Sequence, residues 1–362
     1  MSGLAALVRR FAEDRRYGDI ANNPLAQFGR QGRQYLGATL LPEQARAENM
    51  YREEFVRYRT VIANGGTRYS PVQLKGNDLF GSMMVELGYS DVGAELTAQD
   101  YDSLQRLIMR SADMEAIATL TNWLDFRVVA PLKEFNEWAR WQAIATASVP
   151  ITGANKFQDT VTYSNPSGHR VAAGGTWSNP AYDPWDDIMG IAEMLAGKGY
   201  TVSRIITSKA VVAIMGANPN VAQRTGRVTI TGSNVTIAGG ARASLASINS
   251  ALAEDNLPAI ETYDLQYATE TGTNRFLPAG TMVFACETGR DVEIDAGDTR
   301  LYFPNTLGYV GIGVAAGQPD PGTIIRMDLY ENKPPRIAAE GWQASLPVIL
   351  DPEALAVINS IA

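Results

Sequence analysis

The clearest hydrophobic pattern lies between residues 183 and 208, in DPWDDIMGIAEMLAGKGYTVSRIITS. Asp183 has the side chain of a helix N-cap, and Pro184 fits the first turn of a helix. Apolar residues then recur on one helical face: Ile188, Ile191, Ala192 and Leu195. Gly197 and Gly199 predict the end of the helix, where Lys198 can complement the last carbonyl groups. A strand is predicted next, from Val202, Ile205 and Ile206.

A longer apolar periodicity covers residues 97 to 147 and predicts a spine-like helix. Thr97 and Asp100 have the spacing of a capping box at its start. Before Pro131 the apolar stripe consists of Leu104, Leu107, Ile108, Ile117, Leu124 and Val128, and after it of Phe135, Trp138, Ile144 and Ala145. Because proline lacks an N–H group and clashes with the preceding turn, Pro131 is predicted to kink or divide this helix.

Residues 55 to 96 alternate between strand-like segments and turn signals and predict a long β-hairpin. The turn signals are Asn64, Gly65 and Gly66, followed by Lys75, Gly76 and Asn77. The hairpin has too few apolar residues to be stable in isolation. We therefore expect it to lie on another surface.

The first fifty residues predict an extended arm, with a short amphipathic segment followed by PLAQFGRQGRQYLGATLLPE. Its arginines are Arg9, Arg10, Arg15, Arg16, Arg30 and Arg33. Such a cluster fits a solvated arm, an arm packed on an acidic neighbour, or one that contacts a polyanion. We favour an arm packed on a neighbour.

Helical and strand patterns alternate between about 183 and 289, which indicates a compact α/β or α+β domain. A loop rich in Gly, Ser and Thr interrupts it, and the tail returns to strands. The predicted division is 1–50 for the arm, 51–96 for the hairpin, 97–182 for the region of the long helix, 183–289 for the compact domain and 290–362 for the returning strands. The predicted fold class is α+β.

Composition narrows the function more than the fold. A net charge of −8 argues against nucleic-acid binding through a broad basic face. No apolar run is long enough to cross a bilayer, and the N-terminus has no convincing secretion signal, so we expect a cytoplasmic protein without a membrane partner. The single cysteine, Cys286, excludes an internal disulfide and is predicted to be a buried strand residue.

Residue types that carry chemistry are scarce. The single histidine, His169, lies in a predicted turn without a second metal ligand, and we expect it to be satisfied or exposed there. GIGVAAG, residues 311 to 317, fails as a dinucleotide motif because prolines follow where a helix should begin. The sequence contains two pairs of acidic residues, Asp186 with Asp187 and Asp351 with Glu353. Helix capping or a position on the surface accounts for each pair without a catalytic role. We therefore expect no catalytic, cofactor-binding or metal-binding residue.

From YLGATLLPE onward, the sequence resembles the tailed-phage major capsid proteins of the lambda capsid protein E type. The early LLPE, EFNEWARWQAIATA and TWSNPAYDPWDDIMGIAEMLAGKGYTVSRIITSKAVVAIMGANPNV carry the resemblance. It continues through LPAIETYDLQYATETGTNRFLPAGTMVFA and ENKPPRIAAEGWQASLPVILDPEALAVI. It covers most of residues 35 to 360 in the expected order and departs from some relatives in the loop at 225 to 245.

The resemblance implies the Hong Kong 97 fold. Residues 183–289 would form the axial domain, 97–182 and 290–362 the peripheral domain, and 51–96 the extended loop of this family. The arm and the loop would lie over adjacent subunits. The hypothesis for the assembly interface names Leu4, Leu7, Phe11, Phe55, Tyr58, Ile62, Met83, Met84 and Val85.

The resemblance also implies a function without catalysis. The chain would form homo-pentamers and homo-hexamers of an icosahedral shell in a virion, assembled in the host bacterial cytoplasm. Its partners would be a portal protein, a scaffolding protein and, in some relatives, a decoration or cement protein. The shell would enclose double-stranded DNA without sequence-specific binding. The alternatives are an encapsulin-like compartment shell and, with less support, a cytoplasmic α/β enzyme.

Overall fold

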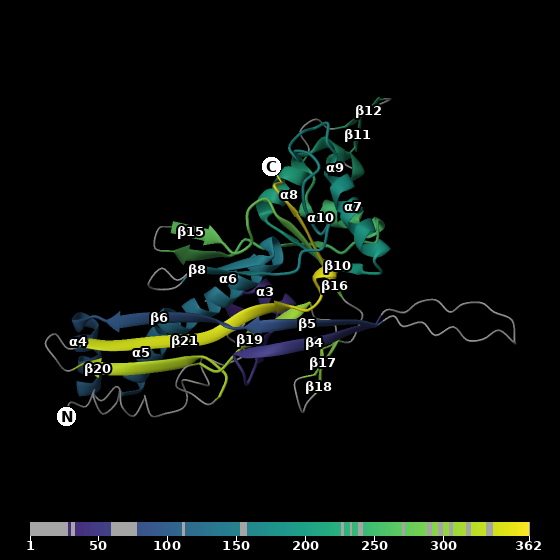
Figure 1. Cartoon of the computed structure of the whole chain (residues 1–362). Helices are drawn as coiled ribbons and strands as arrows, with labels where there is room; N and C mark the ends of the chain where they lie inside the picture. The colour runs from purple at the N-terminus through teal and green to yellow at the C-terminus, as the bar shows by residue number, and fades with distance from the viewer. Residues whose placement is uncertain are drawn as a thin grey trace, which may run out of the picture.

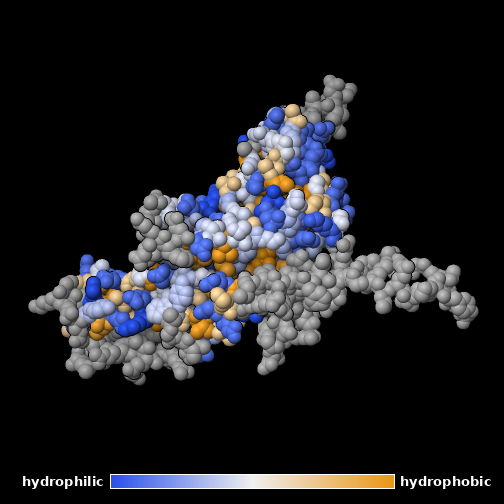
Figure 2. All heavy atoms as spheres, in the orientation of Figure 1, coloured by the Kyte–Doolittle hydropathy of each residue, from blue (hydrophilic) through white to orange (hydrophobic). Residues whose placement is uncertain are grey.

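The computed structural model describes residues 28–29, 33–58, 78–110, 113–152, 158–225, 228–231, 234–237, 242–269, 272–287, 292–295, 300–303, 307–315, 320–330 and 336–361. These residues form an upper and a lower unit in the view of Figure 1. On the face seen in Figure 2, hydrophilic residues cover most of the upper unit, and apolar residues gather where it meets the lower unit.

The upper unit is built on a five-stranded sheet of order β13-β10-β16-β22-β9. Its strands are β13 (Ile260–Thr262), β10 (Thr201–Thr207), β16 (Met282–Glu287), β22 (Leu355–Asn359) and β9 (Arg170–Ala172). The helices of this unit are α7 (Pro184–Gly197), α8 (Lys209–Ala217), α9 (Pro219–Arg224) and α10 (Leu245–Glu254). Two small hairpins are β11 (Val228–Thr231) with β12 (Asn234–Ile237), and β14 (Gln266–Thr269) with β15 (Gly272–Arg275).

The predicted helix, turn and strand at 183–208 are confirmed as α7 and β10. The Asp183 carboxylate accepts a hydrogen bond from the Trp185 N–H at 3.0 Å. Gly199, at φ +83°, ends the segment in a backbone conformation that favours glycine. The face of α7 that packs on the sheet buries Trp185, Ile188, Ile191 and Leu195.

The lower unit is a sheet of order β20-β21-β19-β3, with β6 paired to the free side of β21. Its strands are β20 (Ile324–Tyr330), β21 (Arg336–Ile349), β19 (Gly308–Ile312), β3 (Glu43–Ala45) and β6 (Gly88–Leu96). Helices α4 (Ala98–Met109), α5 (Asp113–Leu124) and α6 (Ala130–Thr146) belong to this unit, with β7 (Ser148–Thr152) and β8 (Gln158–Thr162) after α6. A core joins helices and sheet through residues such as Leu104, Leu120, Val128, Ile337 and Ala339.

The long predicted helix is divided between Met109 and Asp113, where α4 ends and α5 begins, which the sequence did not predict. Directly before Pro131 the α-helical pattern is interrupted without a break in the chain. A π-helical turn, η3 (Asp125–Val129), joins α5 to α6, and Pro131 occupies the first turn of α6. Because the wider turn redirects the backbone donors just before the proline, the chain passes Pro131 without a break. Thr97 is confirmed as the cap of α4: its hydroxyl accepts from the Asp100 N–H at 3.4 Å and donates to the Asp100 carboxylate at 2.7 Å.

The hairpin region consists of β4 (Met50–Tyr58) and β5 (Asp78–Glu86), paired in antiparallel register from Met50 with Glu86 to Tyr58 with Asp78. It is part of a four-stranded sheet, because β17 (Val292–Asp295) pairs with β4 at Phe55 and β18 (Arg300–Phe303) pairs with β17. The hairpin therefore has a strand partner within its own chain, which the sequence did not predict.

The last strand differs from the prediction for residues 290–362. The chain leaves β21 at Ile349, passes a 3-10 turn, η5 (Pro352–Ala354), and enters the upper sheet as β22. There β22 pairs antiparallel with β16 and parallel with β9. The returning segment is thus shared between the two units, and β9 of the predicted 97–182 region also belongs to the upper sheet. Pairing of distant strands, which local patterns do not encode, decides this arrangement.

Candidate functional site

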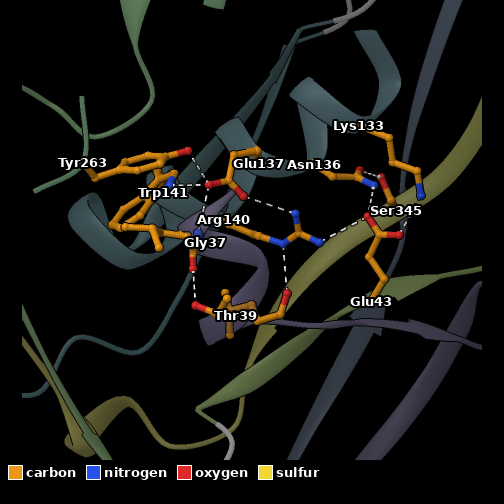
Figure 3. A network of polar contacts seen from close by, with 12 residues as sticks. Gly37, Thr39, Glu43, Lys133, Asn136, Glu137, Arg140, Trp141, Tyr263 and Ser345 are labelled. Carbon is orange, nitrogen blue, oxygen red and sulfur yellow. Dashed lines mark hydrogen bonds and ion pairs between the residues drawn. The ribbon is translucent and has the colours of Figure 1, made fainter. Parts of the chain in front are cut away.

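The most concentrated set of polar side chains lies along the inner face of α6, between the two units (Figure 3). The fully buried Glu137 is its centre. One oxygen of this carboxylate, Oε1, accepts hydrogen bonds from the Gly37 N–H at 2.9 Å, the Trp141 indole N–H at 2.7 Å and the Tyr263 hydroxyl at 2.7 Å. The other, Oε2, pairs with the Arg140 guanidinium at 3.3 Å. Glu137 therefore joins α3 (Leu36–Leu40), α6 and the upper unit.

Glu43, at the start of β3, forms the second acidic centre of the network. Its carboxylate pairs with the Lys133 ammonium at 2.7 Å and the Arg140 guanidinium at 3.2 Å, and accepts a hydrogen bond from the Asn136 amide at 3.0 Å. Arg140 also donates to the Leu41 carbonyl at 2.9 Å. One guanidinium thus bridges both carboxylates and the backbone between α3 and β3.

Asn136 extends the network to the long strand β21. Its side-chain oxygen accepts hydrogen bonds from the Gln343 amide at 2.8 Å and the Ser345 hydroxyl at 2.9 Å. The Gln343 oxygen in turn accepts from the Thr323 hydroxyl at 3.0 Å. All four side chains are buried. Their hydrogen bonds satisfy polar groups in the core, where an unpaired group would be strongly destabilising.

Charge balance explains why the protein tolerates these ions in its interior. Glu43 and Glu137 are matched by Lys133 and Arg140. Burial raises the pKa of Glu43, but the charges and hydrogen bonds of Lys133 and Arg140, with the Asn136 amide, outweigh it and lower the pKa to about 2. Burial and the adjacent Glu137 raise the pKa of the Tyr263 phenol well above its usual range. The Glu43 carboxylate therefore stays ionised, and the Tyr263 phenol stays a donor.

This arrangement is better suited to holding elements of the chain together than to catalysis. Each carboxylate is occupied by donors from its own chain, and the Trp141 and Tyr263 rings stack at 5.0 Å between the same elements. Across the described residues, no group of three or more His, Cys, Asp or Glu side chains is placed to hold a metal ion. No described helix is long and apolar enough to span a membrane. The network fixes the segment from Gly37 to Ala45 on α6.

A second polar cluster holds the loop before α7. Asp187, predicted as a dipole or surface carboxylate, accepts hydrogen bonds from the Trp177 indole at 2.7 Å, the Tyr182 hydroxyl at 2.5 Å and the Gly174 N–H at 3.2 Å. The Asn218 amide donates to the backbone carbonyls of the same loop. These contacts explain the residue types in TWSNPAYDPWDD by folding of the loop.

His169 is fully buried. The sequence predicted either a histidine with satisfied hydrogen bonds or an exposed one, and the structure shows the first. Its Nδ1 lies 2.8 Å from the Leu355 carbonyl, and its Nε2 lies 2.6 Å from the Lys198 ammonium. The Leu355 carbonyl can only accept, so Nδ1 carries the proton and Nε2 accepts from Lys198. Lys198, predicted to complement the end of α7, instead reaches this imidazole. Burial, with the Lys198 charge, lowers the pKa of His169.

The other residues with candidate chemistry have structural roles. Asp351 caps η5 through the Glu353 N–H at 3.2 Å and accepts from the Tyr200 hydroxyl at 2.9 Å. Gly311 belongs to the buried strand β19, not to a phosphate-binding turn. Cys286 is buried in β16 as predicted, and burial raises the pKa of its thiol to about 12.

The predicted assembly residues fall into three groups. Leu4, Leu7, Phe11 and Ile62 lie outside the described residues. Phe55, Tyr58, Met83 and Met84 are placed by their backbones in β4 and β5. For Val85 the prediction was wrong, because this residue does not depend on a neighbouring subunit for its burial. It is 4% exposed and packs in a core of its own chain. The other members of that core are Leu87, Tyr309, Ala344, Leu346, Val348 and Leu350.

Sequence reasoning missed the network on α6, although a signal was present. Lys133, Glu137 and Arg140 follow one another at spacings of four and three residues, which places them on one helical face. That face also carries Asn136 and Trp141. Charged residues at this spacing usually mark a solvated face, so the pattern alone could not identify a buried one.

The Glu43 contacts predict a defined effect of charge removal. We expect Glu43→Gln to lower the free energy of unfolding of the unassembled subunit at pH 7 by about 2–3 kcal/mol, because the ion pairs with Lys133 and Arg140 are largely shielded from water. Wild-type Glu43 has a folded pKa below its unfolded value, about 4.3. Its contribution is therefore complete above pH 5 and is lost as the pH falls through about 2.

Urea unfolding of both proteins from pH 7 to pH 2 measures this contribution. Glu95→Gln is the matched control, since the Glu95 pair with Arg336 is exposed on both sides and should change stability by less than about 1 kcal/mol. An equal loss in the two variants, or a Glu43→Gln effect that persists at pH 2, would contradict the assignment.

His169 predicts a second pH dependence. Because its pKa is lowered in the folded chain, the unfolded chain binds a proton first, below about pH 6.5. The free energy of unfolding should then decrease with falling pH by up to about 1.4 kcal/mol per unit. In His169→Gln the amide can donate to Leu355 and accept from Lys198, so this slope should disappear while stability at pH 8 is retained. Since the chain has one histidine, its imidazole NMR signals report the titration directly. A pKa at or above 6.5 would be the opposite result.

Comparisons with known proteins agree with the architecture. A family model described as phage major capsid protein E matches residues 97–320. No curated protein sequence matches the chain. The capsid protein of a prophage in E. coli CFT073 is 16% identical, with a TM-score of 0.57 over 99% of this chain and 98% of that chain. At this identity the likeness shows the fold, which is the Hong Kong 97-type capsid fold predicted from the sequence.

Two further solved structures are similar at lower scores. A phage-related protein from Bordetella bronchiseptica RB50 is 13% identical, with a TM-score of 0.49 over 92% of this chain and 95% of that chain. An encapsulin complex from Synechococcus elongatus PCC 7942 is 12% identical, with a TM-score of 0.42 over 90% of this chain and 87% of that chain. The encapsulin alternative is weaker than the phage one, because the family model that matches residues 97–320 describes a phage major capsid protein.

The family match begins at the capping box before α4 and includes all of α6 and most of the upper unit. It therefore covers the α6 side chains of the polar network and the loop held by Asp187, whereas Gly37, Glu43, Gln343 and Ser345 lie outside it. With more than half of the chain matched, this protein belongs to the phage major capsid protein E family.

Proposed function

We propose that this chain is the major capsid subunit of a tailed bacteriophage, which self-assembles into pentamers and hexamers of an icosahedral shell around double-stranded DNA. The observation that carries the proposal is the family match over residues 97–320. The role is structural and not enzymatic. The occupied carboxylates of Glu43 and Glu137 support this, since they hold elements together and leave no acceptor for a substrate.

The two units correspond in this proposal to the domains of the family. The lower unit is the peripheral domain, with α6 as its spine. The upper unit is the axial domain, whose loops meet around the capsomer axis. The hairpin of β4 and β5 is the extended loop, and with the N-terminal arm it lies over adjacent subunits. The side chains of the predicted assembly residues, Val85 excepted, make these contacts.

The expected partners and location follow from this role. Copies of the chain are the main partner, with a portal protein at one vertex, a scaffolding protein during assembly and a decoration or cement protein where the phage has one. Assembly takes place in the host bacterial cytoplasm, and the product is a virion capsid. The net charge of −8 supports a shell that encloses DNA without binding it tightly, because a strongly basic inner surface would hinder packaging and release.

Electron microscopy and sedimentation of the expressed protein test the proposal. We expect closed shells, either formed by the chain alone or formed with its scaffolding protein, and subunits that pentamerise and hexamerise. A stable monomer or dimer at micromolar concentration, under conditions with scaffolding protein present, would contradict it. Shells filled with a host protein instead of DNA would favour the encapsulin alternative.

The extended loop gives a second prediction. Residues 59–77 lie between the paired Tyr58 and Asp78, so an Asn-Gly turn can replace them without disturbing β4 or β5. Because β6 pairs with β21 over nine residues, the deletion must stop before it. The shortened subunit should unfold at a temperature within about 2 °C of wild type, since it loses no described contact, but should not form shells.

A control distinguishes loop length from loop sequence. In this control a Gly/Ser linker of equal length replaces residues 59–77. If the specific side chains carry the contacts, this variant should also fail to assemble. Shells that close normally with the Asn-Gly turn would show that the loop is dispensable.

A further inference from the structure

A groove runs along β6 at the far end of the lower unit. It has a volume of about 680 Å³ and lies between β6, α4, α5 and η3. Its apolar lining includes Val92, Ala94, Leu104, Leu107, Leu120 and Trp123. Leu104 and Leu120 form the buried floor, whereas Leu107 and Trp123 are only partly buried. The groove is thus a hydrophobic surface that the described residues leave partly open.

Strand β6 forms one wall of the groove and is an edge of its sheet. It pairs with β21 on one side, and none of the described strands pairs with the other. Residues 92 to 97 line the groove in succession. Apolar surface beside a free sheet edge is a typical location for a docked segment, because it would otherwise remain in contact with water.

The rim of the groove carries charges of both signs. Glu95 on β6 and Asp100 on α4 line it, and Glu95 already pairs with Arg336 at 3.1 Å. Arg127 is the one basic residue among the lining residues. A segment that combines an apolar face with charges of both signs would therefore match both the floor and the rim.

Residues 4–16 of this sequence, LAALVRRFAEDRR, have that combination. Leu4, Leu7, Val8 and Phe11 recur at the i, i+3, i+4 and i+7 spacing of a helix that binds a groove. The segment contains four arginines, against Glu13 and Asp14 as its only acidic residues. Residues 17–27, which join it to the described chain at Phe28, span at most about 36 Å when extended. This length is enough to reach a neighbouring subunit in a shell.

We propose that the groove along β6 receives residues 4–16 of an adjacent copy of this chain. The inference rests on the proposed function, since it requires neighbouring copies. Leu4, Leu7 and Phe11 pack on the floor formed by α4 and α5, and the charged residues of the segment face rim groups of the opposite sign. Each subunit then lends its arm to one neighbour and receives an arm in its own groove, which links the copies in a closed ring.

Disulfide trapping tests this contact. The native Cys286 is buried, so new cysteines can be read without background. Ser103 lines the groove and is exposed, and its exchange for cysteine is nearly isosteric. Particles are assembled from a mixture of two singly substituted chains, Leu7→Cys and Ser103→Cys, and then oxidised. Because each chain carries one new cysteine, a disulfide between position 7 and position 103 can form only between copies.

We expect disulfide-linked dimers on non-reducing gels, with a 7–103 cross-link identified by mass spectrometry. The control pairs Leu7→Cys with Met109→Cys, at a residue of α4 that is 75% exposed and does not line the groove. It should give at least about tenfold less cross-linked product, because a disulfide needs Cα atoms within about 7 Å.

Four results would overturn the inference. The first is intact particles without a 7–103 cross-link, and the second is equal cross-linking in the control. The third is a cross-link that forms in a doubly substituted chain, Leu7→Cys with Ser103→Cys, but not in the mixture, which would place the arm in its own groove. A mixture of Arg68→Cys with Ser103→Cys tests the extended loop as the occupant, and cross-linking there in place of position 7 also overturns it. Failure to form any particle with the wild-type chain would instead contradict the proposed function.

Discussion

The buried ion network on α6 is the interaction on which the two-unit architecture depends. Glu137 alone connects Gly37 in α3, Trp141 in α6 and Tyr263 in the upper unit. Removing an ion from water costs several kcal/mol, so a buried carboxylate is tolerated only when its partners are in place. The folded structure therefore requires contacts between residues about a hundred positions apart. These hydrogen bonds hold the segment at Gly37, helix α6 and the upper unit together.

The packed region around α6 differs from the parts of the chain that are less covered. Around α6, the polar network and the apolar core fill the interior of the subunit. By comparison, the hairpin of β4 and β5 contacts the rest of its chain through one residue pair with β17 and through the buried Val85, and the groove along β6 keeps apolar residues partly exposed. A subunit that must fit several neighbours needs both properties. A well-packed body keeps the shape of the subunit constant. Apolar surfaces that are only partly covered in one copy become buried against other copies.

Local patterns were accurate wherever neighbouring residues decide the structure. Asp183 caps α7, and Thr97 pairs with Asp100, because capping involves groups within a few residues. The burial of Cys286 followed from the apolar strand around it. The capsid fold and the family were also accessible from the order of several motifs. Predictions failed where distant segments compete, as at Val85, which its own chain covers.

The sequence by itself determined the helices and strands with strong periodicity, the absence of a recognisable catalytic motif and the membership of a capsid family. Only the tertiary structure decided that Lys133, Glu137 and Arg140 face the interior, that β22 joins the upper sheet, and that β6 borders an apolar groove. The physical reason is the same in each case. Helical spacing says which residues share a face, but the elements packed on that face, distant in sequence, decide whether it meets water, an ion partner or another strand.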